Sequence, residues 1–346
     1  MIAFVESKTP DMGRVASLLD LCLSRNQWAN RGPLYGMLAE SYEAHFGLGP
    51  DRTVVPCANG GVALEAMSRL MGLRAGRPLR WVGSAFSFQN LGRGHFAGMR
   101  FVDCDAQGLM DLDEVRALDP ESYDGIVVVN PFGLFRDFSA YIRFARETGK
   151  ALLIDNAAGV DATIPDWPWQ SFSLHHTKPY GAGEGGLALV PAEEAEAFYA
   201  LLDYGSAPKE PGAWLNNGKI SDIACAFLID RLERVGDWAP RYHEQAVRVG
   251  RIAQEAGLSP VRPMGDAPPA TSWVFLAQNQ IPMERIRASR RIVFAKYYKP
   301  LADLPRTLTL FDRLANIPTH PDMAQLDDRE LAEEIRILAG ALQAAG

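Results

Sequence analysis

The chain has 346 residues, a formal net charge of −7 and a hydrophobic content of 47%. A chain of this length buries a large core and usually divides into two domains. The acidic balance and the lack of a basic run argue against nucleic acid as a constant partner, although they leave room for a local basic pocket that binds a phosphorylated substrate.

Cysteine usage and hydropathy exclude further classes. The four cysteines are scattered without paired spacing, at Cys22, Cys57, Cys104 and Cys225. This pattern is typical of reduced thiols in a cytosolic protein and does not indicate a disulfide framework or a zinc site. The first ten residues do not form a signal peptide, and no apolar run approaches the roughly 18 residues of a membrane span. We therefore expect a cytoplasmic protein without a membrane segment or a bound metal.

In the first half of the chain, short apolar runs alternate with helical patterns. We expect strands at 53–56, 79–83, 99–103, 125–130 and 151–155, and helices at 62–71 and 138–148. The run at 125–130 is continuously apolar and β-branched, as in a strand that is buried on both faces. This alternation predicts an α/β fold with a mostly parallel sheet and helices on both of its faces.

The composition changes near residues 203–219. A Gly/Pro-rich loop at 204–212 precedes an expected helix at 221–234. Past Trp238 the pattern is that of a smaller α+β unit, whose last helix is expected at 328–342 with Asp327 or Asp328 near its N-cap.

The segment 171–186 carries the strongest chemical signal. Lys178 follows a β-like run and precedes a glycine-rich turn, and Ser173 lies five positions before it. Upstream, Asp155 closes the apolar run 151–154. A pyridoxal phosphate enzyme needs such a lysine to bind the cofactor covalently and such an aspartate to keep the pyridine nitrogen protonated, so that the ring acts as an electron sink. A surface lysine before a loop would show the same spacing, so the spacing alone leaves both interpretations open.

Segment 173–178, followed by 183–186, resembles the lysine motif of the DegT/DnrJ/EryC1/StrS family of pyridoxal-phosphate-dependent aminotransferases, which are best known for acting on nucleotide-linked keto sugars. Other segments resemble the family's landmarks in the family's order, at 28–34, 58–64, 216–222, 297–301 and 316–323. The resemblance covers about the whole chain. It implies the fold type I of these transferases, with a large cofactor-binding domain at 1–235 and a small C-terminal α+β domain at 236–346.

The resemblance also assigns the cofactor's phosphate to individual residues. Gly60 and Gly61 fall on the phosphate-binding turn, where N–H groups at a helix N-terminus bind anions. The family usually has threonine at the second position, so one donor is missing, and Ser173, on the family's phosphate-binding serine, can supply part of it. Asn217 falls on an asparagine that reaches the cofactor of the neighbouring subunit, although Asn-Asn-Gly is also a strong turn signal. This implies a homodimer with shared active sites.

Other positions are ambiguous or depart from the family. Phe86 falls where the family places an aromatic residue that stacks on the pyridine ring, and Phe88 competes with it because the alignment needs a one-residue gap. Ala158 stands where the family commonly has glutamine or histidine, and Asn130 stands where it has histidine. Asn156 is polar but lies at a strand position that points elsewhere.

The resemblance implies transfer of an amino group from glutamate or glutamine to a nucleotide-linked deoxy-keto sugar, in polysaccharide or O-antigen biosynthesis. Three alternatives stand beside it: a pyridoxal-phosphate-dependent sugar dehydratase, an aminotransferase for an aminocyclitol or another secondary-metabolite ketone, and a non-enzymatic regulator. Dehydratases of the family replace the lysine with histidine, so Lys178 argues against the first. The intact set of Lys178, Asp155 and Ser173 argues against the third.

Overall fold

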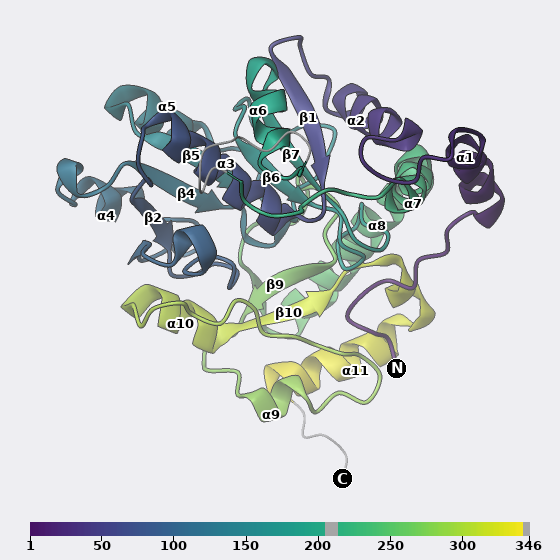
Figure 1. The fold of residues 1–346 in the computed structure, drawn as a ribbon. Coiled ribbons are helices and arrows are strands. Elements are labelled where there is room, and N and C mark those ends of the chain that lie inside the picture. Colours follow the sequence, from purple (N-terminus) through teal and green to yellow (C-terminus); the bar gives the residue numbers. More distant parts are fainter. Residues whose placement is uncertain (205–213, 342–346) are drawn as a thin grey trace.

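A computed structural model describes residues 1–204 and 214–341 of the protein (Figure 1). Residues 205–212 of the expected Gly/Pro-rich loop, and residue 342 at the end of the last expected helix, lie outside the described residues.

A seven-stranded sheet forms the centre of the larger part of the fold (Figure 1). Its strand order is β1-β7-β6-β5-β4-β2-β3. Strand β7 runs antiparallel to both of its neighbours, and the other adjacent strands are parallel. The strands are β1 (Arg52–Cys57), β2 (Trp81–Ser84), β3 (Arg100–Val102), β4 (Gly125–Val129), β5 (Ala151–Asp155), β6 (Gln170–Ser173) and β7 (Gly186–Pro191).

Both faces of this sheet are buried at β4, which has no polar side chain at any position. In β4, Ile126 and Val128 belong to one hydrophobic cluster, whereas Val127 and Val129 belong to another on the opposite face. Successive side chains of a strand point to opposite faces, so a continuous apolar run lets helices cover both. The predicted two-sided burial of 125–130 is confirmed.

Helices supply the covering layers. Helix α3 contributes to the cluster on one face and α5 to the cluster on the other. The larger part contains α1 (Met12–Arg25), α2 (Pro33–Phe46), α3 (Gly60–Arg74), α4 (Leu112–Arg116), α5 (Ser139–Thr148), α6 (Ala195–Ala200) and α7 (Asp222–Glu233). The long helix α8 (Val235–Glu255) follows, and the C-terminal part adds α9 (Met283–Ile286), α10 (Pro305–Arg313) and α11 (Asp328–Ala339).

Several expected helix ends are confirmed by their caps. Gly149 ends α5 in the left-handed region with φ 68°, where a residue without Cβ is not strained. Ser221 caps α7 through a bond from Ala224 N. Asp327, rather than Asp328, caps α11 and forms a reciprocal capping box with Glu330.

A second, antiparallel sheet lies below the first in Figure 1, in the order β10-β9-β8. Its strands are β8 (Ser259–Pro260), β9 (Ser272–Leu276) and β10 (Leu314–Pro318). The N-terminus joins this part, since Ile2 bridges Ile292, and Figure 1 shows it beside α11. All strands of the large sheet precede residue 236 in the sequence, and all strands of the small sheet follow it. The division into domains 1–235 and 236–346 stays a prediction.

Candidate active site

The carboxyl ends of β4, β5 and β6 meet at one edge of the large sheet. Register pairs Val129 with Asp155 and Asp155 with Ser171, so the predicted aspartate lies in the middle of this edge. Asp155 is 3% exposed. Its carboxylate accepts bonds from Ala157 N at 3.2 Å, Ser171 Oγ at 3.4 Å and Asn90 Nδ2 at 3.5 Å. These three hydrogen bonds therefore hold the buried carboxylate in a fixed orientation.

Lys178 lies in the irregular connection between β6 and β7. The turn is closed by Lys178 N bonding to His175 O at 2.8 Å and by Gly181 N bonding to Lys178 O at 2.9 Å. Gly181 is required here, because a Cβ would stand 1.9 Å from His175 O. The fold thereby sets the lysine close to the strand ends.

Lys178 and Asp155 are coupled electrostatically. Burial raises the pKa of Asp155, and the Ala157 N–H, Asn90 and the Lys178 charge oppose this. Burial lowers the pKa of Lys178, and Asp155 opposes this. Each group therefore depends on the other, or on a bound charge, for its charged form. Such perturbed neighbours at a strand end are typical of a catalytic site.

The predicted phosphate turn lies against the end of β6. Asn59 caps α3 by accepting a bond from Val62 N at 2.9 Å. A Cβ on Gly60 would lie 3.0 Å from Phe172 O, so glycine allows the turn to approach the strand next to Ser173. Gly61 is the next residue of the same helix end. The N-terminus of α3 thus lies beside Ser173, and their use as an anion site for the cofactor's phosphate stays a prediction.

The two candidates for the stacking aromatic residue, Phe86 and Phe88, differ in burial. Phe86 is 1% exposed and packs in the core, with its ring centroid 6.0 Å from that of Phe132 and 5.6 Å from that of Tyr298. A Cβ on Gly108 would lie 2.8 Å from the Phe86 ring, so the ring is enclosed on that side too. Phe86 therefore presents no free face, whereas Phe88, the competing candidate, is 51% exposed.

Asn217 is exposed on a segment that lies beside the phosphate turn of its own chain. Ala58 N donates to Gly218 O at 2.7 Å. The neighbouring Asn216 has a buried Oδ1 without a hydrogen-bond partner among the described residues. The assignment of Asn217 to the partner's site stays a prediction.

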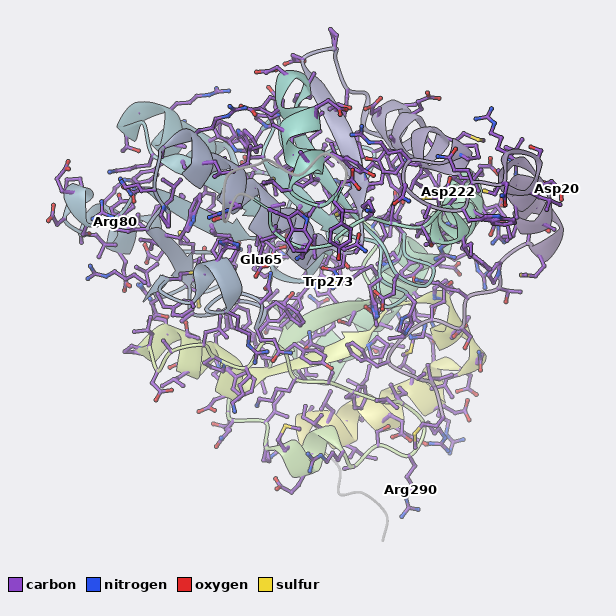
Figure 2. All side chains as sticks on the ribbon, viewed as in Figure 1. Asp20, Glu65, Arg80, Asp222, Trp273 and Arg290 are labelled. Atoms are coloured by element: carbon purple, nitrogen blue, oxygen red, sulfur yellow. The ribbon has the colours of Figure 1, made fainter. Side chains whose placement is uncertain are left out.

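Two motifs that are far apart in sequence meet at Asp222, the first residue of α7 (Figure 2). Its buried carboxylate accepts bonds from Leu34 N at 2.8 Å and Gly32 N at 3.2 Å. A Cβ on Gly32 would lie 2.5 Å from this carboxylate, so glycine is required. The resembling segments 28–34 and 216–222 are thus joined by one buried anchor.

The sequence reasoning missed two contacts of Asp155. Ser171 shares a face of β6 with Ser173 through the two-residue period of a strand, a signal that could have revealed it. Asn90 lies in an irregular segment, where no periodicity places its amide against Asp155. Asn156 points elsewhere, as expected: its Oδ1 accepts from Asn130 Nδ2 at 2.7 Å.

The residues present fit pyridoxal phosphate. The anion site suits its phosphate, Asp155 suits its ring nitrogen, and Lys178 suits its aldehyde. In the segment 87–90, which brings Asn90 to Asp155, two buried polar atoms have no hydrogen-bond partner among the described residues: Ser87 Oγ and Asn90 Oδ1. Unpaired buried polar atoms are costly, and a polar ligand would relieve them.

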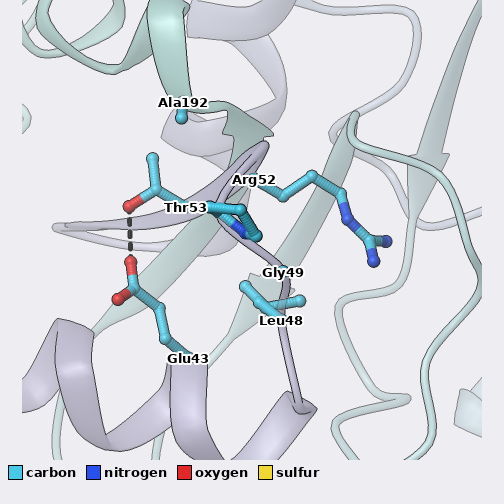
Figure 3. A pocket seen from close by; sticks show the side chains of 7 residues that line it. Glu43, Leu48, Gly49, Arg52, Thr53 and Ala192 are labelled. Carbon is cyan, nitrogen blue, oxygen red and sulfur yellow. Dashed lines mark hydrogen bonds between the residues drawn. The ribbon is translucent and has the colours of Figure 1, made fainter.

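A separate pocket of about 490 Å³ lies between α2 and the start of β1 (Figure 3). Its lining includes Glu43, Arg52 and Thr53, and the Thr53 hydroxyl donates a hydrogen bond to the Glu43 carboxylate. The start of β1 lies roughly 15 Å along the strand from its end at Cys57, so this pocket is not the cofactor site. Within residues 1–204 and 214–341, no cluster of three or more His, Cys, Asp or Glu side chains could hold a metal.

Comparison with known proteins agrees with this geometry. The model of the DegT/DnrJ/EryC1/StrS aminotransferase family matches residues 14–336. The chain belongs to this family. The predicted resemblance, the fold class and the family's cofactor, pyridoxal phosphate, are thereby confirmed, and so is the class of pyridoxal-phosphate-dependent aminotransferases.

Individual relatives share low sequence identity with this chain. The protein Rv3402c of Mycobacterium tuberculosis strain H37Rv is 28% identical over 249 residues, which cover 67% of this chain and 60% of that protein. The L-glutamine:2-deoxy-scyllo-inosose aminotransferase of Streptoalloteichus tenebrarius is 24% identical over 291 residues, 74% of this chain and 66% of that enzyme. The chain thus spans less than two thirds of the length of these curated relatives.

A solved structure shows the same fold. DesI, crystallised in the presence of its TDP-sugar product, superposes with a TM-score of 0.77 at 20% identity and covers 96% of this chain and 91% of its own.

Among the described residues, no helix is long and apolar enough to cross a bilayer.

Proposed function

We propose that this chain moves an amino group from glutamate or glutamine to the keto group of a nucleotide-linked deoxy-keto sugar. The observation that carries the proposal is the coupled pair of Lys178 and Asp155 beside the anion site of α3 and Ser173. Support for the sugar comes from DesI, whose structure was determined with its TDP-sugar product.

Each residue has a separate task. When bound, pyridoxal phosphate supplies an electron sink for the negative charge left on a substrate carbon after a proton departs. Asp155 holds the positive charge on the ring nitrogen. Lys178 would anchor the cofactor through its aldehyde and would hold and move the proton at the substrate carbon. Ser173 and the N–H groups of Gly60 and Gly61 hold the phosphate, and Phe88 covers one face of the ring.

We further propose a cytoplasmic homodimer in which Asn217 completes the partner's phosphate site. A two-fold interface makes such sharing reciprocal, so that both sites gain the same contact. All four cysteines are buried and unpaired, in keeping with a reducing compartment.

An aminocyclitol ketone is the second candidate substrate. The relative from Streptoalloteichus tenebrarius is named for transfer from L-glutamine to 2-deoxy-scyllo-inosose, which supports both this acceptor class and glutamine as the donor. The sugar dehydratase is not favoured, because Lys178 is present.

Two half-reactions test the proposal. Protein loaded with pyridoxal phosphate is mixed with glutamate or glutamine alone, and the visible absorbance of the lysine-bound cofactor is followed. A change that is reversed by a nucleotide-linked keto sugar supports the sugar assignment, whereas reversal only by a keto-cyclitol favours the second candidate. No change with any amino donor would contradict aminotransferase activity.

Borohydride reduction and peptide mapping identify the anchoring lysine. We expect the label on the peptide that contains Lys178 and no label in Lys178→Ala protein. That variant should still bind the cofactor more weakly and lose transamination by several orders of magnitude. Label on any other lysine of the wild-type protein would refute the assignment.

A further inference from the structure

The carbonyl oxygens of the turn that carries Lys178 are held by a second lysine from the N-terminal segment. Lys8 Nζ donates to His176 O at 2.6 Å, to Gly181 O at 2.7 Å and to Lys178 O itself. An ammonium group has three donors, and here three carbonyls accept them. Burial lowers the pKa of Lys8 to about 7, and in the ammonium form its bonds to the carbonyls are about twice as strong as neutral ones.

Two further side chains complete this external support. Arg231 Nε donates to Pro179 O at 2.8 Å, and Thr271 Oγ1 donates to Thr177 O at 2.7 Å. Arg231 comes from α7, and Thr271 comes from the segment just before β9. The connection from β6 to β7 is not part of the sheet ladder, and distant side chains supply hydrogen bonds to its carbonyls in addition to those of the turn itself.

Lys8 is itself held in place by its neighbours. Glu6 Oε2 accepts bonds from Arg231 Nη2 at 2.7 Å and from Tyr242 Oη at 2.8 Å. Ser7 N donates to Asp322 Oδ2 at 2.8 Å. The segment 6–8 therefore ties α7, α8 and the C-terminal part to the lysine turn, and its position is fixed independently of Lys178.

We propose that Lys8 is a positioning residue for Lys178. Its effect on the reaction rate rests on the proposed function, whereas its effect on the position of Lys178 does not. The Lys178 side chain must move when substrate displaces it, so its reach is set by where the backbone places its Cα. Displacement of a reacting group by about 1 Å can cost on the order of a hundredfold in rate. Lys8 acts through the main chain, since the charged group that acts on the pKa of Lys178 is Asp155.

Lys8→Met removes the ammonium and keeps the aliphatic stem. The matched control is Lys150→Met, because Lys150 Nζ also donates to main-chain carbonyls, at 2.6 Å from Pro120 O and 2.9 Å from Tyr123 O, but outside the active site. Cofactor-free protein of each variant is mixed with pyridoxal phosphate, and the appearance of lysine-bound absorbance is timed. We expect attachment to slow at least tenfold in Lys8→Met and less than twofold in Lys150→Met.

The decisive measurement repeats cofactor binding in the Lys178→Ala background. If Lys8 acts through Lys178, the single variant Lys8→Met should retain the cofactor less well than the wild type. When Lys8→Met is added to Lys178→Ala, the affinity for the cofactor should change less than threefold. Equal weakening in both backgrounds would overturn the proposal, because Lys8 would then support the pocket as a whole. Attachment rates that match those of Lys150→Met would also overturn it.

Folding is controlled by a second variant. Lys8→Gln keeps two neutral donors and should show an intermediate attachment rate with a melting temperature near that of the wild type. If neither variant folds, Lys8 is a requirement of folding and the positioning role is refuted. None of these measurements uses an amino donor or acceptor, so failure of the proposed reaction would leave their outcome unaffected.

Discussion

The side-chain amide of Asn130 donates to Asn156 Oδ1 at 2.7 Å, behind the edge of the sheet that presents Asp155. Asn130 also bonds Phe135 through both ends of its amide, and Asn156 Nδ2 donates to Gln170 Oε1 at 3.3 Å. All three amides are at least 98% buried. Asn130, which stands where the family has histidine, thus forms one buried polar network with Asn156 and Gln170.

Truncation of this network should destabilise the protein. Asn156→Ala removes one hydrogen bond from the Asn130 amide and one from the Gln170 amide, which costs about 1–3 kcal/mol of the free energy of unfolding. Urea unfolding measures the loss. Asn279→Ala, at an exposed position, is the control and should change stability by less than about 0.5 kcal/mol. Equal stability of the two variants would show that the network contributes nothing.

Asp155→Asn should separate binding from chemistry. The variant keeps the shape of the side chain but removes the charge that holds the ring nitrogen protonated. The amino-donor half-reaction should slow by roughly 10²–10³-fold, whereas cofactor affinity should fall much less, because the lost interaction acts on the transition state. Single-turnover absorbance and equilibrium titration give the two numbers. A variant that turns over at the wild-type rate would remove Asp155 from its assigned role.

Phe86 and Phe88 should respond oppositely to truncation. Phe86→Ala empties a core position and should lower the free energy of unfolding by about 3–5 kcal/mol. Phe88→Ala should leave stability near that of the wild type and weaken cofactor binding by about 0.5–1.5 kcal/mol, the value of an aromatic pair. Thermal melting and cofactor titration of both variants test this. If Phe88→Ala retains full affinity, stacking belongs to another residue.

Asn217 should act across the subunit interface. Loss of its bond to the phosphate in Asn217→Ala should weaken cofactor retention by about 1.5–3 kcal/mol without unfolding the protomer. Mixing Asn217→Ala with Lys178→Ala protein produces mixed dimers in which one site carries neither lesion, so at a cofactor concentration too low to load Asn217→Ala, activity should return as subunits exchange. Because Gly218 lies beside the phosphate turn of its own chain, the opposite result is informative. A mixture that stays inactive during demonstrated exchange would place Asn217 in its own subunit's site.

Acid should weaken the attachment of the N-terminus through His320. This ring is fully buried against Ala3 O, and burial lowers its pKa. The unfolded chain therefore takes up a proton first as the pH falls, so stability that is present above about pH 6.5 is lost as the pH falls through the lower folded-state pKa. Between pH 7.5 and 5.5, His320→Gln should lose less stability in urea than the wild type. The exposed His95→Gln should lose as much as the wild type, and identical pH dependence of His320→Gln would contradict the mechanism.

Local pattern in the sequence predicted most of the elements, and the resemblance to the family indicated the residues of the site. Continuous apolar runs place β4 and β5, because a strand buried on both faces cannot alternate with polar residues. The resemblance predicts Lys178, Asp155 and the Gly60-Gly61 turn as site residues, and each lies at or shortly after the end of a strand, where parallel strands bring their carboxyl ends together.

Tertiary packing decided what local pattern could not express. Phe86 and Phe88 are chemically identical and two residues apart, and only the contacts of Phe132, Tyr298 and Gly108 enclose the first and leave the second exposed. The bond between Lys8 and the turn of Lys178 spans 170 residues of chain. Such contacts depend on how distant segments pack, and a sequence of local preferences carries no signal for them.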